Sequence, residues 1–253
     1  MVALFGLALS QVPRVSGGDT IVFSYQWVDK LGVEFSFLLD GFSIFFILLI
    51  TGMGALIFLY SQEYMRQHAN RLKFYVWMLI FSGAMLGLVT ASNLVVIYLF
   101  WEMTTISSYF LIGLTDQEEE SRYNALQAIL VTTLGSLAML AGFMILYQIF
   151  NTLEITEIWS RSSEIHGNSL AIPAASMIII GVVAKSALMP FHIWLPSAMV
   201  APTPVSAYLH SATMVTAGVF LVARFTPLFS GIGSWEVPIV TLGIGTLLIA
   251  GLL

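Results

Sequence analysis

The stretch Gly181-Val-Val-Ala-Lys185-Ser-Ala-Leu-Met-Pro190-Phe-His-Ile-Trp-Leu-Pro196 decides how the rest of the sequence is interpreted. It places one lysine inside an apolar run and follows it with two prolines. Proline removes a backbone donor and clashes with the preceding helical turn, and a broken backbone inside lipid persists only where protein or water satisfies it. We therefore predict a discontinuous membrane helix that breaks between about residues 187 and 196, at Pro190 and Pro196.

The composition around this stretch is that of a membrane protein. Of 253 residues, 58% are hydrophobic and 9% are charged, whereas soluble domains carry about 25% charged residues. The 9 basic residues are scattered and the net charge is -5, so we predict no nucleic-acid partner. The chain has no cysteine, which excludes disulfides, thiolate metal sites and iron–sulfur clusters. We expect no cofactor in this chain.

Apolar runs of membrane-spanning length recur along the chain. A hydrocarbon core about 30 Å thick requires roughly 20 apolar helical residues. The segments that meet this criterion are 39–60, 74–90, 93–114, 123–150, 170–189, 205–225 and 238–253. The longest connecting segments, 13–38 and 151–169, are predicted to be polar loops, and no linker divides the chain. We predict an all-α, polytopic helix bundle, a single transmembrane domain over 1–253, in the inner (plasma) membrane.

Both ends of the sequence lie in apolar stretches. Residues 1–9 lack the positive n-region and the cleavage site of a signal peptide, so we interpret them as the end of a spanning helix. The chain stops at Gly-Leu-Leu without a polar flank. These features predict a fragment of a longer protein.

Two charges interrupt the predicted spans, Glu102 and Lys185. A charge at the bilayer centre costs at least about 2.5 to 3.5 kcal/mol, which is tolerated when the group faces a partner or a water-filled cavity. Because their signs are opposite, we predict that they face each other across neighbouring helices. Burial disfavours the charged form of both groups, so both are candidates for exchanging protons. The alternative is a static salt bridge that only fixes helix packing.

Histidines and hydroxyl side chains add candidates for a proton path. His210 and His192 lie at or near membrane depth, where imidazole is the usual proton-relay group; the alternative is a histidine that is only packed in the core. No metal-ligand spacing surrounds them, so no metal site is predicted. The side chains that could hold ordered water in such a path, or could instead serve helix packing, are Ser107, Ser108, Thr132 and Thr213. Asp40 is predicted to lie at the N-terminus of a span.

The two longest motifs resemble a known family. They are Phe100-Trp-Glu102-Met-Thr-Thr, and the run from Lys185 to Pro196 followed by Ala201-Pro-Thr-Pro-Val-Ser-Ala-Tyr-Leu-His-Ser-Ala-Thr-Met-Val215. Both resemble the antiporter-like subunits shared by respiratory complex I and the multisubunit Mrp-type cation/proton antiporters. The similarity runs over essentially the whole chain. The stretches Gly83-Ala-Met-Leu-Gly87 and Val222-Ala-Arg224-Phe are most similar to the branch that contains the A subunits of Mrp antiporters.

This resemblance implies the first half of an inverted-repeat, antiporter-like fold built from five-helix units. The first unit would span 74–225, and 238–253 would begin the next. Glu102 would be the charge-pair glutamate, Lys185 the protonatable lysine on the broken helix, and His210 a link toward the central hydrophilic axis. The sequence departs from the family at two positions. Ser197 stands where Asp is common, and Thr216 stands where some relatives carry Lys. The second repeat lies outside this sequence.

The function implied is that of a proton-translocating subunit in a multisubunit Mrp-type monovalent cation (Na+)/proton antiporter. Its partners would be other membrane subunits, and the transported ions protons and Na+. The alternative is a proton-pumping membrane subunit of complex I or of a membrane-bound hydrogenase, in which case it would belong to a redox-driven translocase. A structural membrane subunit with an inactive charge pair is a third possibility. Whether the complex is an enzyme therefore stays open at this point.

Overall fold

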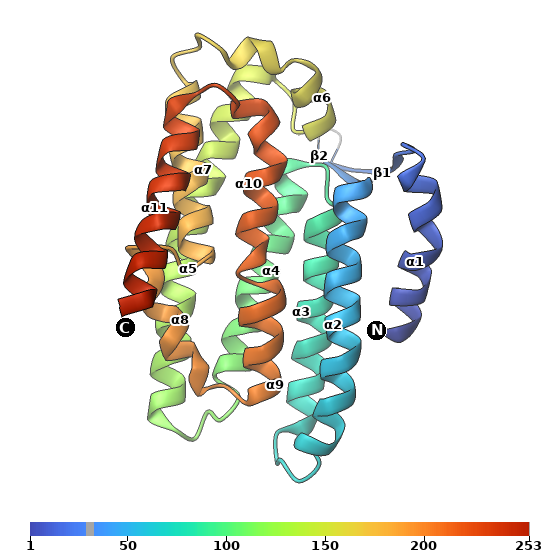
Figure 1. The fold of residues 1–253 in the computed structure, drawn as a ribbon, viewed down its shortest axis with the longest axis vertical. Helices are drawn as coiled ribbons and strands as arrows, with labels where there is room; N and C mark the ends of the chain where they lie inside the picture. Colours follow the sequence, from blue (N-terminus) through green and yellow to red (C-terminus); the bar gives the residue numbers. More distant parts are fainter. Residues whose placement is uncertain (29–32, 253) are drawn as a thin grey trace.

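The computed structural model describes residues 1–28 and 33–252, which form a helix bundle with a two-stranded hairpin at one end (Figure 1). The longer elements are α1 Val2–Ser16, β1 Ile21–Val28, β2 Val33–Leu39, α2 Gly41–Tyr64, α3 Arg71–Thr90, α4 Leu94–Ile112, α5 Glu119–Phe150, α6 Ile155–Ser160, α7 Ala171–Lys185, α8 Trp194–Ser197, α9 Thr203–Ser206, α10 Thr216–Phe229 and α11 Gly233–Leu252. Short 3₁₀ turns are η2 Ser162–Ile165, η3 Phe191–Ile193 and η4 Ala198–Val200, and η5 Ala207–Thr213 is a π-helix.

Within the described residues, six helices are long and apolar enough to cross a membrane. They are Gly41–Tyr64, Arg71–Thr90, Leu94–Ile112, Glu119–Phe150, Thr203–Phe229 and Gly233–Gly251. The predicted span 170–189 corresponds to a shorter apolar helix, Ala171–Lys185, and a second short apolar helix, Phe191–Val200, follows it beyond the predicted bounds. The polytopic helix bundle with a discontinuous helix is thus confirmed. The last residue of the predicted span 238–253, Leu253, lies outside the described residues.

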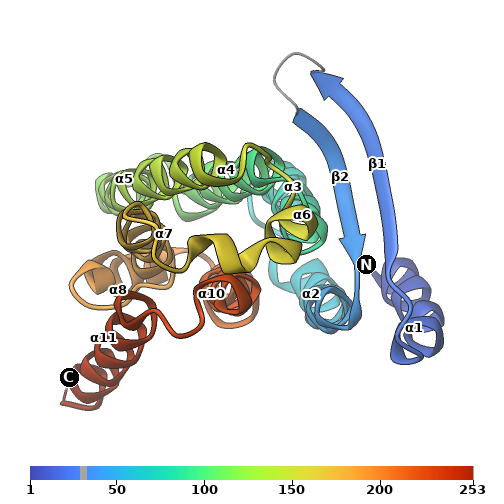
Figure 2. The same cartoon turned by 90° about the horizontal axis from the view of Figure 1, so that it is seen from above.

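The helices form two rows when seen along the bundle (Figure 2). Helices α3, α4 and α5 make one row, and α2, α10 and α7 pack against it, with α1 and α11 outside. Large side chains fill the space between the rows, among them the fully buried Phe81, Trp101, Phe143 and Phe220. Lys185, at the end of α7, is fully buried in this apolar interior.

The side chains of Asp40 and Asn93 cap the N-termini of the spanning helices α2 and α4. The Asp40 carboxylate accepts the Ser43 N–H at 2.8 Å, and the Asn93 side-chain oxygen accepts the Val95 N–H at 3.0 Å. Each bond satisfies a backbone donor that the first helical turn leaves without a partner. The prediction that Asp40 lies at a helix N-terminus is confirmed.

The expectation of a polar loop over 13–38 was wrong. Helix α1 runs to Ser16, and β1 pairs antiparallel with β2 from Ile21↔Leu39 onward. The reason is visible in the alternation Ile21-Val-Phe-Ser-Tyr-Gln-Trp27, which contains β-branched and aromatic residues typical of strands. The segment 151–169 likewise contains helix α6 and a 3₁₀ turn.

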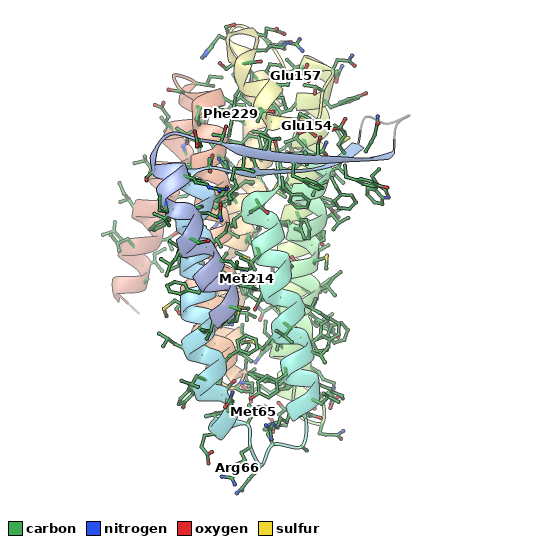
Figure 3. All side chains as sticks on the ribbon, turned by 90° about the vertical axis from the view of Figure 1, so that its right-hand side faces the viewer. Met65, Arg66, Glu154, Glu157, Met214 and Phe229 are labelled. Carbon is green, nitrogen blue, oxygen red and sulfur yellow. The ribbon has the colours of Figure 1, made fainter. Side chains whose placement is uncertain are left out.

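A carboxylate fastens the hairpin to the end of the bundle. Figure 3 shows Glu154 where the hairpin crosses the helices, opposite the end that carries Arg66. The Ser36 hydroxyl of β2 contacts both Glu154 oxygens, at 2.9 and 2.7 Å, and the Asn93 side-chain N–H₂ donates to one of them at 2.6 Å. Glu154 thereby joins the hairpin to the start of α4.

A second polar contact joins α10 to α2 at this end of the bundle. The buried Arg224 forms an ion pair with Asp40 and donates to the Ser43 hydroxyl at 2.6 Å. Aromatic rings at 5.2 to 5.6 Å surround its guanidinium, from Phe42, Phe220 and Trp159. Burial alone would raise the pKa of Asp40, but hydrogen bonds from Arg224 and Ser43 and the charge of Arg224 bring this pKa below its usual value.

We expect Asp40→Asn to lower the free energy of unfolding at neutral pH by about 1 to 3 kcal/mol, because it leaves the Arg224 cation without its counter-ion. The loss stays below the roughly 3 to 5 kcal/mol of a fully buried pair, since Asp40 retains some solvent contact. A carboxyl with a lowered pKa in the folded state contributes stability that is full above about pH 4 and is lost as the pH falls through the lowered value. The difference in thermal unfolding between wild type and variant should therefore shrink as the pH is lowered below about 4. A difference that stays the same from neutral to acidic pH would contradict this assignment.

Candidate functional site

The candidate site is centred on the ammonium group of Lys185. This group donates to three oxygens of α4, the hydroxyls of Thr104 and Thr105 at 2.7 Å each and the carbonyl of Trp101 at 3.2 Å. The ammonium also lies 5.2 Å from the centre of the Trp101 ring, within cation–π range. The side chain of the last residue of α7 thus reaches across the bundle to the middle of α4.

The three acceptors match the three donors of an ammonium group. Thr104 and Thr105 donate their own hydroxyl protons to the Trp101 carbonyl, at 2.7 and 3.2 Å. Their oxygen lone pairs are therefore free to accept from Lys185. A neutral amine has two N–H donors and could bind only two of these three oxygens at once, so the arrangement suits the three N–H groups of an ammonium.

Glu102 and Lys185 form no direct ion pair among the described residues, which leaves the other predicted arrangement, two groups on neighbouring helices that exchange protons. The ion pairs among residues 1–28 and 33–252 do not include these two groups, although both lie at the same level of the bundle. The reason is helical geometry, because successive residues project about 100° apart. Trp101, Thr104 and Thr105 share one face of α4, whereas Glu102 projects beside it. Glu102 is partly buried, and one of its carboxylate oxygens is buried without a hydrogen-bond partner in the described structure.

The helix break begins directly after Lys185. Helix α7 ends there, Ala187 has a positive φ of 51°, and helical turns resume at Phe191. Pro190 lies in the interruption, but Pro196 lies inside α8, so its predicted place at the break was wrong. The physical reason is that Pro196 falls in the first turn of the resumed helix, where the backbone donor that proline lacks has no helical partner.

Protein groups satisfy the backbone at this break. The carbonyls of the last turn of α7 accept from Ser186 N–H at 2.8 Å, Leu188 N–H at 2.9 Å and the Trp194 indole at 2.9 Å. The Met189 N–H donates to the Thr246 hydroxyl of α11 at 2.9 Å. The interruption is therefore stabilised from within the chain, as a non-helical backbone at membrane depth requires.

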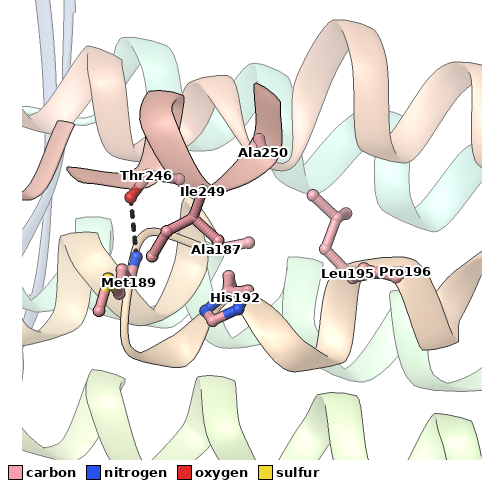
Figure 4. Close-up of a pocket in the computed structure, with 8 residues that line it drawn as sticks. All are labelled: Ala187, Met189, His192, Leu195, Pro196, Thr246, Ile249 and Ala250. Atoms are coloured by element: carbon pink, nitrogen blue, oxygen red, sulfur yellow. Dashed lines mark hydrogen bonds between the residues drawn. The ribbon is translucent and has the colours of Figure 1, made fainter. Parts of the chain in front are cut away.

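A cavity of about 280 Å³ lies beside the break, between the segment after α7 and α11 (Figure 4). His192 lines it, and the Nδ1 atom of this histidine is buried without a hydrogen-bond partner among the described residues. Thr246 contributes the hydroxyl seen in Figure 4 next to Met189. The other lining residues are apolar, so the His192 ring nitrogen and the Thr246 hydroxyl are the side-chain polar groups of this cavity.

His210 lies in the π-helical turn that precedes α10. It is 7% exposed, and neither of its ring nitrogens has a side-chain or backbone partner by hydrogen-bond geometry in the described structure. Its ring contacts Trp194 edge-on, at 5.9 Å between centroids. Single π-helical turns inside α-helices are frequent at functional sites. Figure 3 shows Met214, which directly follows this turn, about halfway along the bundle.

The four hydroxyl candidates are buried, and each donates to a carbonyl of its own helix. Ser107 bonds to Met103 at 2.6 Å, Ser108 to Thr105 at 2.8 Å and Thr132 to Ala128 at 2.7 Å. Thr213 donates to the Tyr208 carbonyl at 2.6 Å across the π-helical turn. Ser107 and Ser108 continue the polar face of α4 toward its C-terminus, one turn after Thr104 and Thr105. Thr132 lies on α5.

Sequence reasoning missed the residues that bind Lys185. Thr104 and Thr105 stand in the quoted Phe-Trp-Glu-Met-Thr-Thr motif, yet only the glutamate was assigned a role. A buried ammonium needs a full set of acceptors, and adjacent threonines beside a buried charge were the available signal. Within the described residues, no group of three or more His, Cys, Asp or Glu side chains could hold a metal ion.

Two family profiles match this chain. The profile described as NADH:quinone oxidoreductase/Mrp antiporter, TM, covers residues 91–253, and that described as NADH-Ubiquinone oxidoreductase (complex I), chain 5 N-terminus, covers 26–75. The first profile includes the Lys185 site, the break and the π-helical turn.

Similar curated proteins are the Na(+)/H(+) antiporter subunits A1 of Staphylococcus haemolyticus and A of Alkalihalophilus pseudofirmus. They are 44% and 45% identical over 99% and 97% of this chain. The chain spans 31% of the length of each, so it corresponds to about a third of these relatives.

Two solved structures share the fold. The Mrp complex from Dietzia contains a chain that is 34% identical, with a TM-score of 0.84 over 96% of this chain and 26% of its own length. The archaeal membrane-bound sulfane sulfur reductase contains a chain that is 22% identical, with a TM-score of 0.81 over 97% of this chain and 50% of its own length. The second likeness shows the fold alone.

Proposed function

This chain belongs to the NADH:quinone oxidoreductase/Mrp antiporter family of multi-pass membrane proteins, and from this membership we propose that it translocates protons as part of an Mrp-type Na+/H+ antiporter. The observation that carries the proposal is the Lys185 ammonium, fully buried at the end of an interrupted helix and bound by three oxygens of α4. A charge at membrane depth marks an ion or proton path when protein groups surround it.

In this proposal Lys185 is the central proton-binding group. It holds a proton while its ammonium is bound to Thr104 and Thr105, and releases the proton when it leaves these acceptors. Glu102 is the second titratable group on α4, and its unpartnered oxygen supports a role in accepting a proton through water. The carboxylate and the amine would thus exchange protons without a direct ion pair.

The histidines extend the proposed path away from the lysine. Among residues 1–28 and 33–252, no hydrogen-bond partner lies by geometry on either ring nitrogen of His210 or on Nδ1 of His192 beside the cavity at the break. An imidazole can accept a proton at one nitrogen and release it at the other. We propose His210 as the link from Lys185 toward the next part of the path, with His192 in a supporting role. Ser107, Ser108, Thr132 and Thr213 would bind water between these groups.

We further propose that 74–225 forms the first five-helix unit of an inverted repeat, and that 238–253 begins the second. The interrupted helix within the first unit supports this division, because transporters of such architecture carry broken helices at their transport sites. Other membrane subunits of a hetero-oligomeric complex would be the partners, since the similar chain from Dietzia belongs to an Mrp complex and the curated relatives are named as antiporter subunits. The transported ions would be protons and Na+, as the names of the curated relatives state for those proteins.

The experiment uses the full-length subunit in its complete complex, in everted vesicles from cells without other Na+/H+ antiporters. We expect added Na+ to dissipate an imposed pH gradient without any electron donor, because antiport uses the ion gradients alone. Adding NADH or another reductant should build no gradient that depends on this subunit.

A matched preparation without the complex controls for leak. The alternative function, a redox-driven proton pump, predicts the reverse result, a reductant-dependent gradient that Na+ does not dissipate. A purely structural subunit predicts Na+-dependent exchange that does not respond to replacement of Lys185.

A further inference from the structure

We propose that Ser186 and Gly218 form a positioning contact that holds the end of α7 against α10 and thereby places Lys185 on its α4 acceptors. The inference rests on the proposed function and refines it, because it assigns residues outside the proton path to the placement of the proton-binding group. Ser186 directly follows Lys185 and ends α7, whereas Gly218 lies in the first turn of α10.

The first observation is a hydrogen bond between the two helices. The Ser186 hydroxyl donates to the Val215 carbonyl at 2.9 Å, and the Ser186 N–H donates to Val182 within α7 at 2.8 Å. Val215 immediately precedes α10 and follows the π-helical turn. The contact therefore joins the helix break to the segment that carries His210.

The second observation is that α10 approaches α7 too closely for any side chain at position 218. A β-carbon on Gly218 would collide with the Ser186 hydroxyl oxygen, and would meet the Ser186 β-carbon and the Val182 carbonyl at 3.2 Å each. Backbone atoms and a short side chain line this approach, so little can move without shifting the end of α7. Close approach of a backbone is a main use of glycine in packed helices.

The third observation is that consecutive residues fix the end of α7 on two sides. Lys185 is bound to α4 through Thr104 and Thr105, and Ser186 is bound to α10. Directly beyond them, Ala187 turns the chain out of the helix with a φ of 51°. Because the helix ends here, no following turn anchors Lys185, and the Ser186 contact supplies that anchor.

The apolar surroundings of Ser186 argue against a role for its hydroxyl in binding water. Ser186 lines a cavity of about 280 Å³ whose other lining residues are apolar or glycine, among them Val182, Val219 and Ile239. A hydroxyl in such a cavity gains from bonding the Val215 carbonyl. Its place next to Lys185 therefore serves the contact between the two helices.

The test is a double-mutant cycle in the full-length subunit within its complex. Gly218→Ala should lower the turnover rate of Na+/H+ exchange by about tenfold to a hundredfold, the effect expected when a reacting group is displaced by about 1 Å. The KM for Na+ should change little. Ser186→Ala should have a smaller effect because it removes the bond without adding bulk. The double variant should exchange faster than Gly218→Ala alone, because the added methyl then meets no hydroxyl.

Gly83→Ala on α3 is the matched control, since a β-carbon there would meet no atom within 4 Å. Additive effects in the cycle, or a Gly218→Ala rate equal to that of the control, would overturn the inference. If Gly218→Ala prevents assembly of the complex, the test rests on Ser186→Ala. An unchanged turnover rate in Ser186→Ala would then refute the positioning contact.

A second readout does not depend on transport. The chain has no natural cysteine, so Lys185→Cys introduces a single thiol into it that a membrane-permeant maleimide can alkylate. Gly218→Ala should change its alkylation rate several-fold, whereas Gly83→Ala should not. Altered alkylation, together with a complex of natural sequence that exchanges no Na+, would refute the proposed function and support the contact. Unaltered alkylation, together with a complex of natural sequence that is active, would refute the contact alone.

Discussion

Replacing Lys185 by Arg is expected to reduce Na+/H+ exchange by about a hundredfold or more, the usual contribution of a positioned proton-transfer group. The variant keeps the positive charge and much of the side-chain length, but a guanidinium does not release its proton in any accessible pH range. The planar guanidinium of the arginine would also have to fit among three oxygens that are arranged around an ammonium group. Exchange measured in vesicles from about pH 6 to pH 9 covers the range in which a proton carrier must work.

Lys185→Ala and Lys185→Met separate transport from assembly. Removing one member of a buried charge pair costs roughly 3 to 5 kcal/mol where the other stays charged. Glu102 can avoid this cost by binding a proton, and it has no direct ion pair to lose. We therefore expect assembled complexes, visible by native gel or size-exclusion chromatography, that do not exchange ions. Near wild-type exchange by the Arg variant would make Lys185 a structural cation and would refute the relay.

The double replacement Thr104→Val and Thr105→Val is expected to have the next largest effect, a loss of exchange of about a hundredfold. Each hydroxyl accepts a bond from Lys185 at 2.7 Å, and a hydrogen bond to a charged group contributes about 1.5 to 3 kcal/mol. A loss of about 1.4 kcal/mol corresponds to a tenfold change in rate. Valine keeps the shape of threonine, so packing changes little while both acceptors are lost. Initial rates of Na+-driven proton movement give the measurement.

Serine at both positions is the matched control, because it retains the hydroxyls and removes only methyl groups. We expect the serine pair to exchange within a few-fold of wild type and the two single valine variants to lie between. If the valine pair transported as well as the serine pair, the three-oxygen site would not hold Lys185 during transport, and the ammonium would act from another position.

Much of the site could be predicted from particular residues because burial of charge in lipid is so costly. Lys185 and Glu102 each stand as a charge inside an apolar run, and Pro190, which follows the lysine after Ser186-Ala-Leu-Met189, predicts the interruption. What could not be predicted was which atoms satisfy the ammonium. A direct pair with Glu102 was the simple solution by charge, yet the rotation of α4 presents two hydroxyls and a carbonyl instead. The place of Pro196 inside α8 was also beyond sequence reasoning, since proline both begins and ends helices.

The membrane class, most of the spans and the charges Lys185 and Glu102 within them could be predicted from the sequence alone. These follow from composition and from the length of apolar runs, which depend on no contact between distant residues. The hairpin pairing, the Arg224–Asp40 ion pair, the threonine site for Lys185 and the approach of Gly218 to Ser186 became visible only in the folded chain. Each of these joins segments far apart in the chain, and helix rotation and interhelical distance set it. No local pattern of residues specifies these two quantities, because they result from how all the side chains pack together.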